Sequence, residues 1–84
     1  EDVQSILFIR LSVNDEPGVL ASIAGTFGAH NVSIESVIQV GRGDQAELVL
    51  VTHEAPENDL NNSIEQITSL SAVTTVTSVL RVYI

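Results

Sequence analysis

The residues best placed to do chemistry lie in one short loop between two apolar runs. Its sequence is Asn14, Asp15, Glu16, Pro17, Gly18, Val19 and Leu20. The preceding run, residues 6–13, predicts a strand, and the following run, residues 17–27, has helical spacing. N–H groups at the start of a helix lack partners within the helix and lie at the positive end of its dipole, so they can hold a carboxylate. Asp15 or Asn14 beside them can take an ammonium group, and the two charges together describe a free amino acid.

The same loop also has a purely structural interpretation. Asp15 or Glu16 can cap the helix, and Pro17 suits the first turn, where a missing N–H has no cost. Gly18 has no Cβ, so the backbone there can be approached closely. A strand-to-helix turn with a good cap needs no ligand, and the motif by itself leaves both interpretations open.

Composition bounds the classes of protein to which the chain can belong. Its 84 residues, 44% of them hydrophobic, are enough for one core, so we expect a single domain over residues 1–84 that is the C-terminal module of a longer chain. The net charge is −8, with eleven acidic residues against three arginines and no lysine. Nucleic-acid binding and attachment to an anionic membrane both need clustered positive charge, so neither partner is expected.

Other sequence features exclude further classes of site and location. The chain has no cysteine, which excludes disulfides, thiolate metal sites and a cysteine nucleophile. No apolar run approaches the roughly 20 residues of a membrane helix, and no basic segment of a signal peptide is present. We therefore expect a cytoplasmic location.

The first half of the chain predicts a strand followed by a helix. Residues 5–14 alternate between an apolar face, with Leu7, Ile9, Leu11 and Val13, and a mixed face, with Ile6, Phe8, Arg10 and Ser12. The helix that follows, over residues 17–27, has an apolar stripe made of Val19, Leu20, Ile23, Ala24 and Phe27. Gly28 ends it, and Asn31 suits a turn with positive φ.

The second half predicts two strands, a helix and a last strand. In the strand over residues 32–40, one face has Ile34, Ile38 and Val40 and the other has Glu35, Val37 and Gln39. A tight turn at residues 41–44 leads to a strand over residues 46–53. Pro56 opens the second helix, whose apolar stripe is Leu60, Ile64, Ile67 and Leu70. Residues 74–84 are rich in β-branched side chains and predict the final strand.

This order, β-α-β-β-α-β, predicts an α+β ferredoxin-like fold: a four-stranded antiparallel sheet with both helices on one face. The other face keeps Ile6, Phe8 and either Val37 or Val49 uncovered. The second strand is expected at an edge of the sheet. Because an apolar face and unpaired edges invite a partner, we expect a homodimer or a higher oligomer.

No constellation in the chain predicts catalysis, a metal site or a cofactor. His30 and His53 each stand alone, without a carboxylate or histidine at metal-ligand spacing. Gly41 and Gly43 lie between two strands rather than before a helix, so they do not form a phosphate loop. No serine lies in a nucleophile elbow. We therefore expect the module not to be an enzyme.

With this order of elements and the loop of residues 15–20, the chain resembles the ACT domain family of small regulatory modules. The resemblance covers all 84 residues. Within the family, the chain most resembles the C-terminal module of homoserine dehydrogenases. The stretches that carry this second resemblance are residues 33–39, 46–55 and 78–82.

The resemblance implies an amino-acid effector bound at a dimer interface, between the first loop of one subunit and the second strand of its neighbour. The implicated residues are Asn14, Asp15, Gly18, Val19, Leu20, Ser33 and Ile34. It implies threonine as the effector, and the catalytic domain of an NAD(P)-dependent homoserine dehydrogenase as the attached partner. Serine-binding members have a polar residue such as His in place of Val13 and Asn in place of Ser33, and this chain departs from them at both positions.

Two alternatives remain beside the amino-acid sensor. One is a structural assembly module in which the loop only caps a helix. The other is a small enzyme of the same fold, such as an acylphosphatase, which needs an arginine in a phosphate-binding loop. The loop after the first strand is acidic here and would repel phosphate, which argues against the enzyme.

Overall fold

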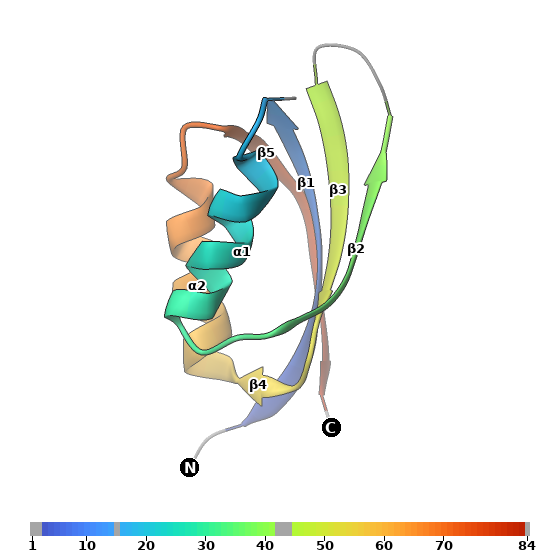
Figure 1. The fold of residues 1–84 in the computed structure, drawn as a ribbon. Helices are drawn as coiled ribbons and strands as arrows, with labels where there is room; N and C mark the ends of the chain where they lie inside the picture. Colours follow the sequence, from blue (N-terminus) through green and yellow to red (C-terminus); the bar gives the residue numbers. More distant parts are fainter. Residues whose placement is uncertain (1–2, 15, 42–44, 84) are drawn as a thin grey trace.

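The computed structural model describes residues 3–14, 16–41 and 45–83. Its elements are β1 (Gln4–Asn14), α1 (Val19–Ala29), β2 (Ile34–Val40), β3 (Gln45–Thr52), β4 (Ala55–Pro56), α2 (Glu57–Thr68) and β5 (Val73–Tyr83) (Figure 1). The turn predicted at residues 41–44 lies, beyond Gly41, outside the described residues. Neither described helix is long and apolar enough to cross a membrane.

The strands form one antiparallel sheet with β1 at its centre. β3 pairs with one edge of β1 and β5 with the other, and β2 pairs with the outer edge of β3. Both helices lie on the same face of the sheet, and no helix covers the opposite face in the described part of the chain (Figure 1). The predicted α+β ferredoxin-like fold is therefore confirmed, with β2 at an edge as expected.

The sheet has one strand more than the four predicted. β4 is only two residues long and pairs with Gln4 and Ser5 at the start of β1. β3 pairs with β1 as far as Val51, and the hydroxyl of the buried Thr52 then accepts a hydrogen bond of 3.0 Å from the N–H of Leu7. The β1 backbone therefore keeps hydrogen-bond partners between the end of its pairing with β3 and the start of its pairing with β4. A two-residue strand is too short to show the alternation from which strands are predicted.

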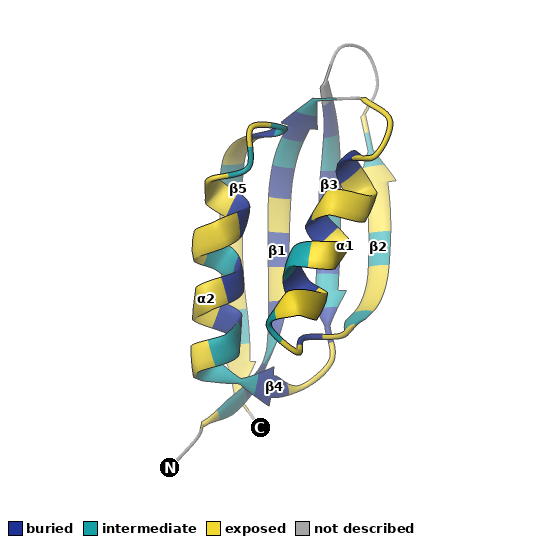
Figure 2. Ribbon diagram, turned by 60° about the vertical axis from the view of Figure 1, so that its left-hand side comes forward, coloured by how far each residue is buried: buried dark blue, intermediate teal, exposed yellow. Residues whose placement is uncertain are grey.

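The core lies between the sheet and the two helices. All four residues assigned to the apolar face of the first strand are buried, and so are Leu60 and Ile67 of α2. Figure 2 shows buried positions alternating with exposed ones along β1. The buried row of α1 is narrower than predicted, because it consists of Val19, Ile23 and Phe27 only. Leu20 is 46% exposed and Ala24 is exposed, so their assignment to the buried stripe was wrong.

The two faces of β2 also differ from the prediction, and a β-bulge is the reason. The register shifts between Ile34 and Ser36, so one extra residue turns the rest of the strand over. Val37 consequently lies opposite the buried Leu50 and packs against the core, as does Ile34. Ile38 lies on the uncovered face and is 57% exposed. Between the two candidates for that face, Val49 lies there and Val37 does not.

Candidate functional site

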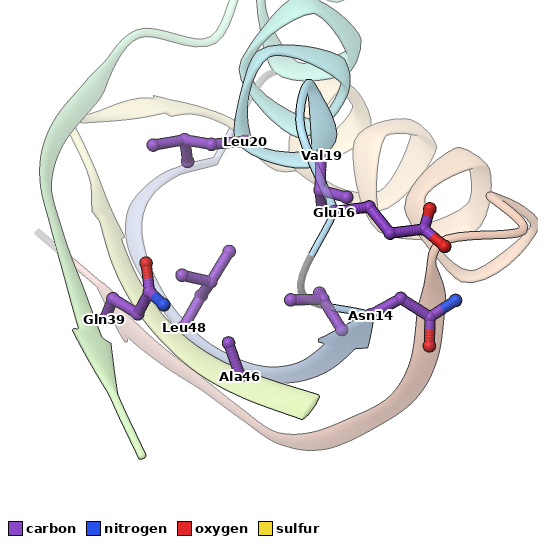
Figure 3. A pocket seen from close by; sticks show the side chains of 8 residues that line it. Asn14, Glu16, Val19, Leu20, Gln39, Ala46 and Leu48 are labelled. Atoms are coloured by element: carbon purple, nitrogen blue, oxygen red, sulfur yellow. The ribbon is translucent and has the colours of Figure 1, made fainter. Parts of the chain in front are cut away.

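A pocket lies where the start of α1 meets the ends of β1 and β2 and the start of β3. Its volume is about 70 Å³. It is lined by eight residues: Val13, Asn14, Glu16, Val19, Leu20, Gln39, Ala46 and Leu48. Figure 3 shows Val19 and Leu20 entering from α1, Gln39 from β2, and Ala46 and Leu48 from β3. The pocket therefore has an apolar wall from the core and a polar rim.

The N-cap residue of α1 is a glycine and not an acidic residue. Gly18 is the N-cap residue, with φ 85°, and its carbonyl accepts the helix's first i→i−4 bond, of 2.9 Å, from the N–H of Ser22. The N-cap residue is therefore neither Asp15 nor Glu16, contrary to the prediction, and among the described residues no side chain caps it. Asp15 itself lies outside the described residues.

The positive φ of Gly18 leads to a stability prediction. Gly18→Ala is expected to lower the free energy of unfolding by about 1–2 kcal/mol, because an L-residue at positive φ is strained. Collision is not the cause, since nothing lies within 4 Å of a Cβ built there. Urea unfolding of the variant and the parent chain measures the difference.

Gly25→Ala is the matched control for this substitution. Gly25 lies inside α1, and a Cβ there would also meet nothing within 4 Å. Because alanine suits a helix interior better than glycine, this variant is expected to gain about 0.5–1 kcal/mol. If the two substitutions changed stability equally, the positive φ at Gly18 would not disfavour alanine.

The first turn of α1 brings partial positive charge to the pocket. Val19 and Leu20 belong to this turn, where backbone N–H groups lack acceptors within the helix and lie at the positive end of the dipole. The described arginines are both engaged elsewhere. Arg10 forms an ion pair of 2.6 Å with Glu47, and Arg81 forms one of 3.1 Å with Glu57. An anion in the pocket would therefore rely on the helix amides.

One ion pair connects two strands of the sheet and the other connects the sheet to α2, and neither lies in the pocket. Arg10 lies on the uncovered face of the sheet, where its hydrogen bond lowers the pKa of the Glu47 carboxyl below the ordinary value. Glu57 also accepts a hydrogen bond of 2.7 Å from the hydroxyl of the buried Ser5, which fixes the first turn of α2 against β1. Within the described ranges, no group of three or more His, Asp or Glu side chains can hold a metal ion.

The predicted site residues divide into two groups. Asn14, Val19 and Leu20 line the pocket together, and Gly18 caps the helix beside it. Ile34 begins β2 at its other end, about 16 Å from Gln39 if five residues rise about 3.3 Å each, and Ser33 precedes it. Within one chain, Ser33 and Ile34 therefore do not contribute to the pocket.

Five of the lining residues, Glu16 among them, were not predicted as ligand-binding residues. Val13 was assigned to the apolar face of a strand, and Ala46 and Leu48 lie in the strand predicted over residues 46–53; these positions do not distinguish a pocket wall from core. Gln39 was detectable, because it shares a strand face with Val37. A core position for Val37 turns Gln39 toward the helices, and the register places Gln39 opposite Leu48.

The polar side chains around the pocket are not equivalent. In Figure 3 the carboxylate of Glu16 and the amide of Asn14 point away from the centre of the pocket. Gln39 lies on the opposite side, beside Leu48 of β3. Gln39 is thus the described polar side chain best placed to meet a group bound between α1 and β2.

Comparison with known proteins places this geometry in a family. The sequence profile of the ACT domain matches residues 7–72. To the homoserine dehydrogenase of Synechocystis sp., the chain is 41% identical over 83 residues. The aligned region covers 98% of the chain and 19% of that protein. The chain therefore spans about a fifth of the length of this relative.

Solved structures agree with the sequence comparison. A homoserine dehydrogenase from Thiobacillus denitrificans superposes with a TM-score of 0.82 at 31% identity, over 99% of this chain and 18% of that one. The ACT domain of a GTP pyrophosphokinase from Chlorobium tepidum superposes with a TM-score of 0.66 at 16% identity, over 98% of this chain and 100% of that one. The second likeness concerns the fold alone.

Proposed function

The chain belongs to the ACT domain family, and on that premise we propose that it is a regulatory module that binds a small amino acid, threonine first among the candidates. In this proposal the bound amino acid feedback-controls an attached enzyme. One observation carries the proposal: the pocket lies at the positive end of α1, between apolar β3 side chains and the amide of Gln39.

Each part of a threonine molecule has a counterpart around the pocket. The first-turn amides of α1 would hold the carboxylate, and Asp15 is the acidic residue of the loop to which we assign the ammonium group. The methyl group would pack against Leu48 and Ala46. The amide of Gln39 would bond the hydroxyl, and a hydrogen-bonding site of this kind rejects an analogue that lacks the hydroxyl.

The volume of the pocket supports a site completed by a second chain. A volume of about 70 Å³ holds roughly five to seven water-sized groups, which is less than a whole threonine needs. β2 is an edge strand, so two copies can pair through it. In an antiparallel pair of β2 strands, the start of one lies beside the end of the other. Ser33 and Ile34 of the second copy would then approach Gln39 of the first.

The attached enzyme is the remaining part of the proposal. The chain matches about one fifth of the length of homoserine dehydrogenases. We therefore infer that its parent is an enzyme of that kind, with this module at the C-terminus. The parent would bring the NAD(P) chemistry and the catalytic domain, and the module would contribute no catalytic residue. Threonine, made from homoserine, would act as a feedback signal. A cytoplasmic location belongs to the same proposal.

Calorimetric titration of the dialysed chain with amino acids tests this function. We expect saturable heat from threonine and weaker binding of valine, which has the same shape but a methyl group in place of the hydroxyl. Serine, which lacks the methyl group, and isoleucine, which has an ethyl group in place of the hydroxyl, complete the series. If no amino acid gives heat, the chain is instead a structural assembly module, which its uncovered sheet face would also suit.

A further inference from the structure

The end of β1 beside the pocket is bonded to the connection between α2 and β5. The N–H of Asn14, a pocket residue, donates a hydrogen bond of 2.9 Å to the carbonyl of Ala72, which directly precedes β5. Val13, also a pocket residue, pairs with Val73, the first residue of β5. Two consecutive pocket residues therefore contact the segment that follows α2. A ligand that displaced their backbone would displace this segment as well.

The start of α2 is bonded to the opposite end of β1. The N–H of Glu57, the first residue of α2, donates a hydrogen bond of 2.8 Å to the carbonyl of Val3. The Glu57 carboxylate accepts the hydrogen bond of the buried Ser5 hydroxyl and forms the ion pair with Arg81. The Arg81 guanidinium also donates a hydrogen bond to the side chain of Asn61. These contacts join four side chains, which we call the terminal cluster: Ser5, Glu57, Asn61 and Arg81.

α2 is suited to transmit a displacement between these two ends. It lies along β1 and β5 (Figure 2), and its 12 residues form a stiff element about 18 Å long. Between its ends it is held by the buried side chains of Leu60 and Ile67, and apolar packing is not directional, so it tolerates small sliding movements. The contacts at its ends are hydrogen bonds and an ion pair, which depend on distance and angle. A shift of α2 along its axis therefore alters both ends together.

Direct contact between a bound amino acid and the terminal cluster is excluded by distance. Asn14 and Ser5 are about 30 Å apart along β1, since nine residues rise about 3.4 Å each. β1 itself is hydrogen-bonded along both edges and is the strand least free to move. α1 also begins beside the pocket, but among the described residues no hydrogen bond or ion pair joins its C-terminal end to β1. α2 is thus the element bonded to β1 at both ends.

We propose that α2 couples the amino-acid site to the terminal cluster, so that a ligand in the pocket fixes the position of α2 and with it the start of β1. This inference rests on the proposed function and adds the route by which the bound amino acid would act. In the proposed parent, the catalytic domain precedes the module and is joined to β1 beside the terminal cluster. The state of the pocket would therefore reach the point where the two domains meet.

Amide chemical shifts measured by NMR during a threonine titration test the coupling in the unsubstituted chain. The reporter is the N–H of Glu57, whose shift depends on its hydrogen bond to Val3. The control is the N–H of Leu7, which lies near the same end of β1 but donates to Thr52 at the end of β3. We expect the Glu57 signal to move and to saturate with the affinity that calorimetry gives. The Leu7 signal should stay in place.

Glu57→Ala tests the coupling from the opposite end, with Asp59→Ala as its matched control. Both substitutions remove an acidic side chain from the first turn of α2, but only Glu57 belongs to the terminal cluster. Without the cluster α2 is held less firmly, so the ligand has to order its end beside the pocket. Calorimetry should therefore give about threefold to thirtyfold weaker threonine binding for Glu57→Ala. Asp59→Ala should stay within about twofold of the unsubstituted chain. Circular dichroism checks folding, and Ser5→Ala, which removes one hydroxyl from the cluster, replaces Glu57→Ala if that variant does not fold.

Each other outcome overturns the coupling, and one of them overturns the proposed function as well. Threonine binding that leaves the Glu57 amide in place, or that moves the Leu7 amide equally, overturns the coupling and leaves the amino-acid site standing. A folded Glu57→Ala variant that binds threonine as tightly as Asp59→Ala does has the same meaning. If no amino acid gives heat with the unsubstituted chain, the proposed function fails and the coupling fails with it.

Discussion

Phe27→Ala is expected to remove about 3–5 kcal/mol of unfolding free energy, the usual cost of deleting a buried aromatic ring. Phe27 is completely buried and forms the last residue of the row by which α1 packs on the sheet. A domain of this size has a total unfolding free energy of about 4–13 kcal/mol, so the variant is expected to lose a large part of its stability. Urea unfolding followed by circular dichroism measures the loss.

Phe8→Ala is the control for this prediction. Phe8 has the same chemistry but lies on the uncovered face of the sheet and is already 38% exposed. Its removal should cost about half as much or less, because less area is returned to water and solvent fills the space. The comparison needs a concentration at which both variants and the parent have the same mass, since association adds stability. Equal costs would mean that α1 does not depend on its narrow buried row.

The contrast between the two phenylalanines was already visible in the sequence. Alternation along the first strand assigned Phe8 to the mixed face, and the spacing of α1 assigned Phe27 to the buried stripe. Both assignments are confirmed. They were predictable because a period of 2.0 residues in a strand, or of 3.6 in a helix, assigns each side chain to one face when only one face of the element is buried. The same reasoning yielded the order of the elements and hence the fold.

The errors arose where a single residue interrupts a period. One extra residue in the bulge after Ile34 exchanges the faces of β2, and no residue type in residues 34–36 announces a bulge. Gly18 takes the N-cap position through its positive φ, whereas the residue types favoured an acidic cap. Both features depend on how the elements meet in space, and local sequence does not encode this.

Among the described pocket residues, the sequence predicted only those that lie close together in the chain. Asn14, Val19 and Leu20 are adjacent in sequence and line the pocket together. Gln39 reaches the same pocket only through the pairing of β2 with β3. Ser33 and Ile34 were predicted from resemblance as residues of a neighbouring subunit, and that contribution stays a prediction.

Asp15→Asn is expected to weaken threonine binding roughly tenfold to a hundredfold. If the helix amides hold the carboxylate of the ligand, Asp15 supplies the negative charge for its ammonium group. Asparagine keeps the size and the hydrogen-bonding oxygen but removes that charge, and a hydrogen bond to a charged group contributes about 1.5–3 kcal/mol. Stability should barely change, because the N-cap position belongs to Gly18. Calorimetry with threonine measures the affinity, and thermal unfolding measures the stability.

Glu16→Gln separates a specific contact from a general effect of charge. It removes one negative charge from the neighbouring position, but the Glu16 carboxylate points away from the pocket (Figure 3). An exposed charge that does not touch the ligand is screened by water and salt, so affinity should stay within about twofold of the parent. If both variants lost affinity equally, the loop would attract the ammonium group only through its overall charge. If neither lost affinity, the ammonium group would have to be held elsewhere. The side chains that a second β2 brings to Gln39 would then be the next to test.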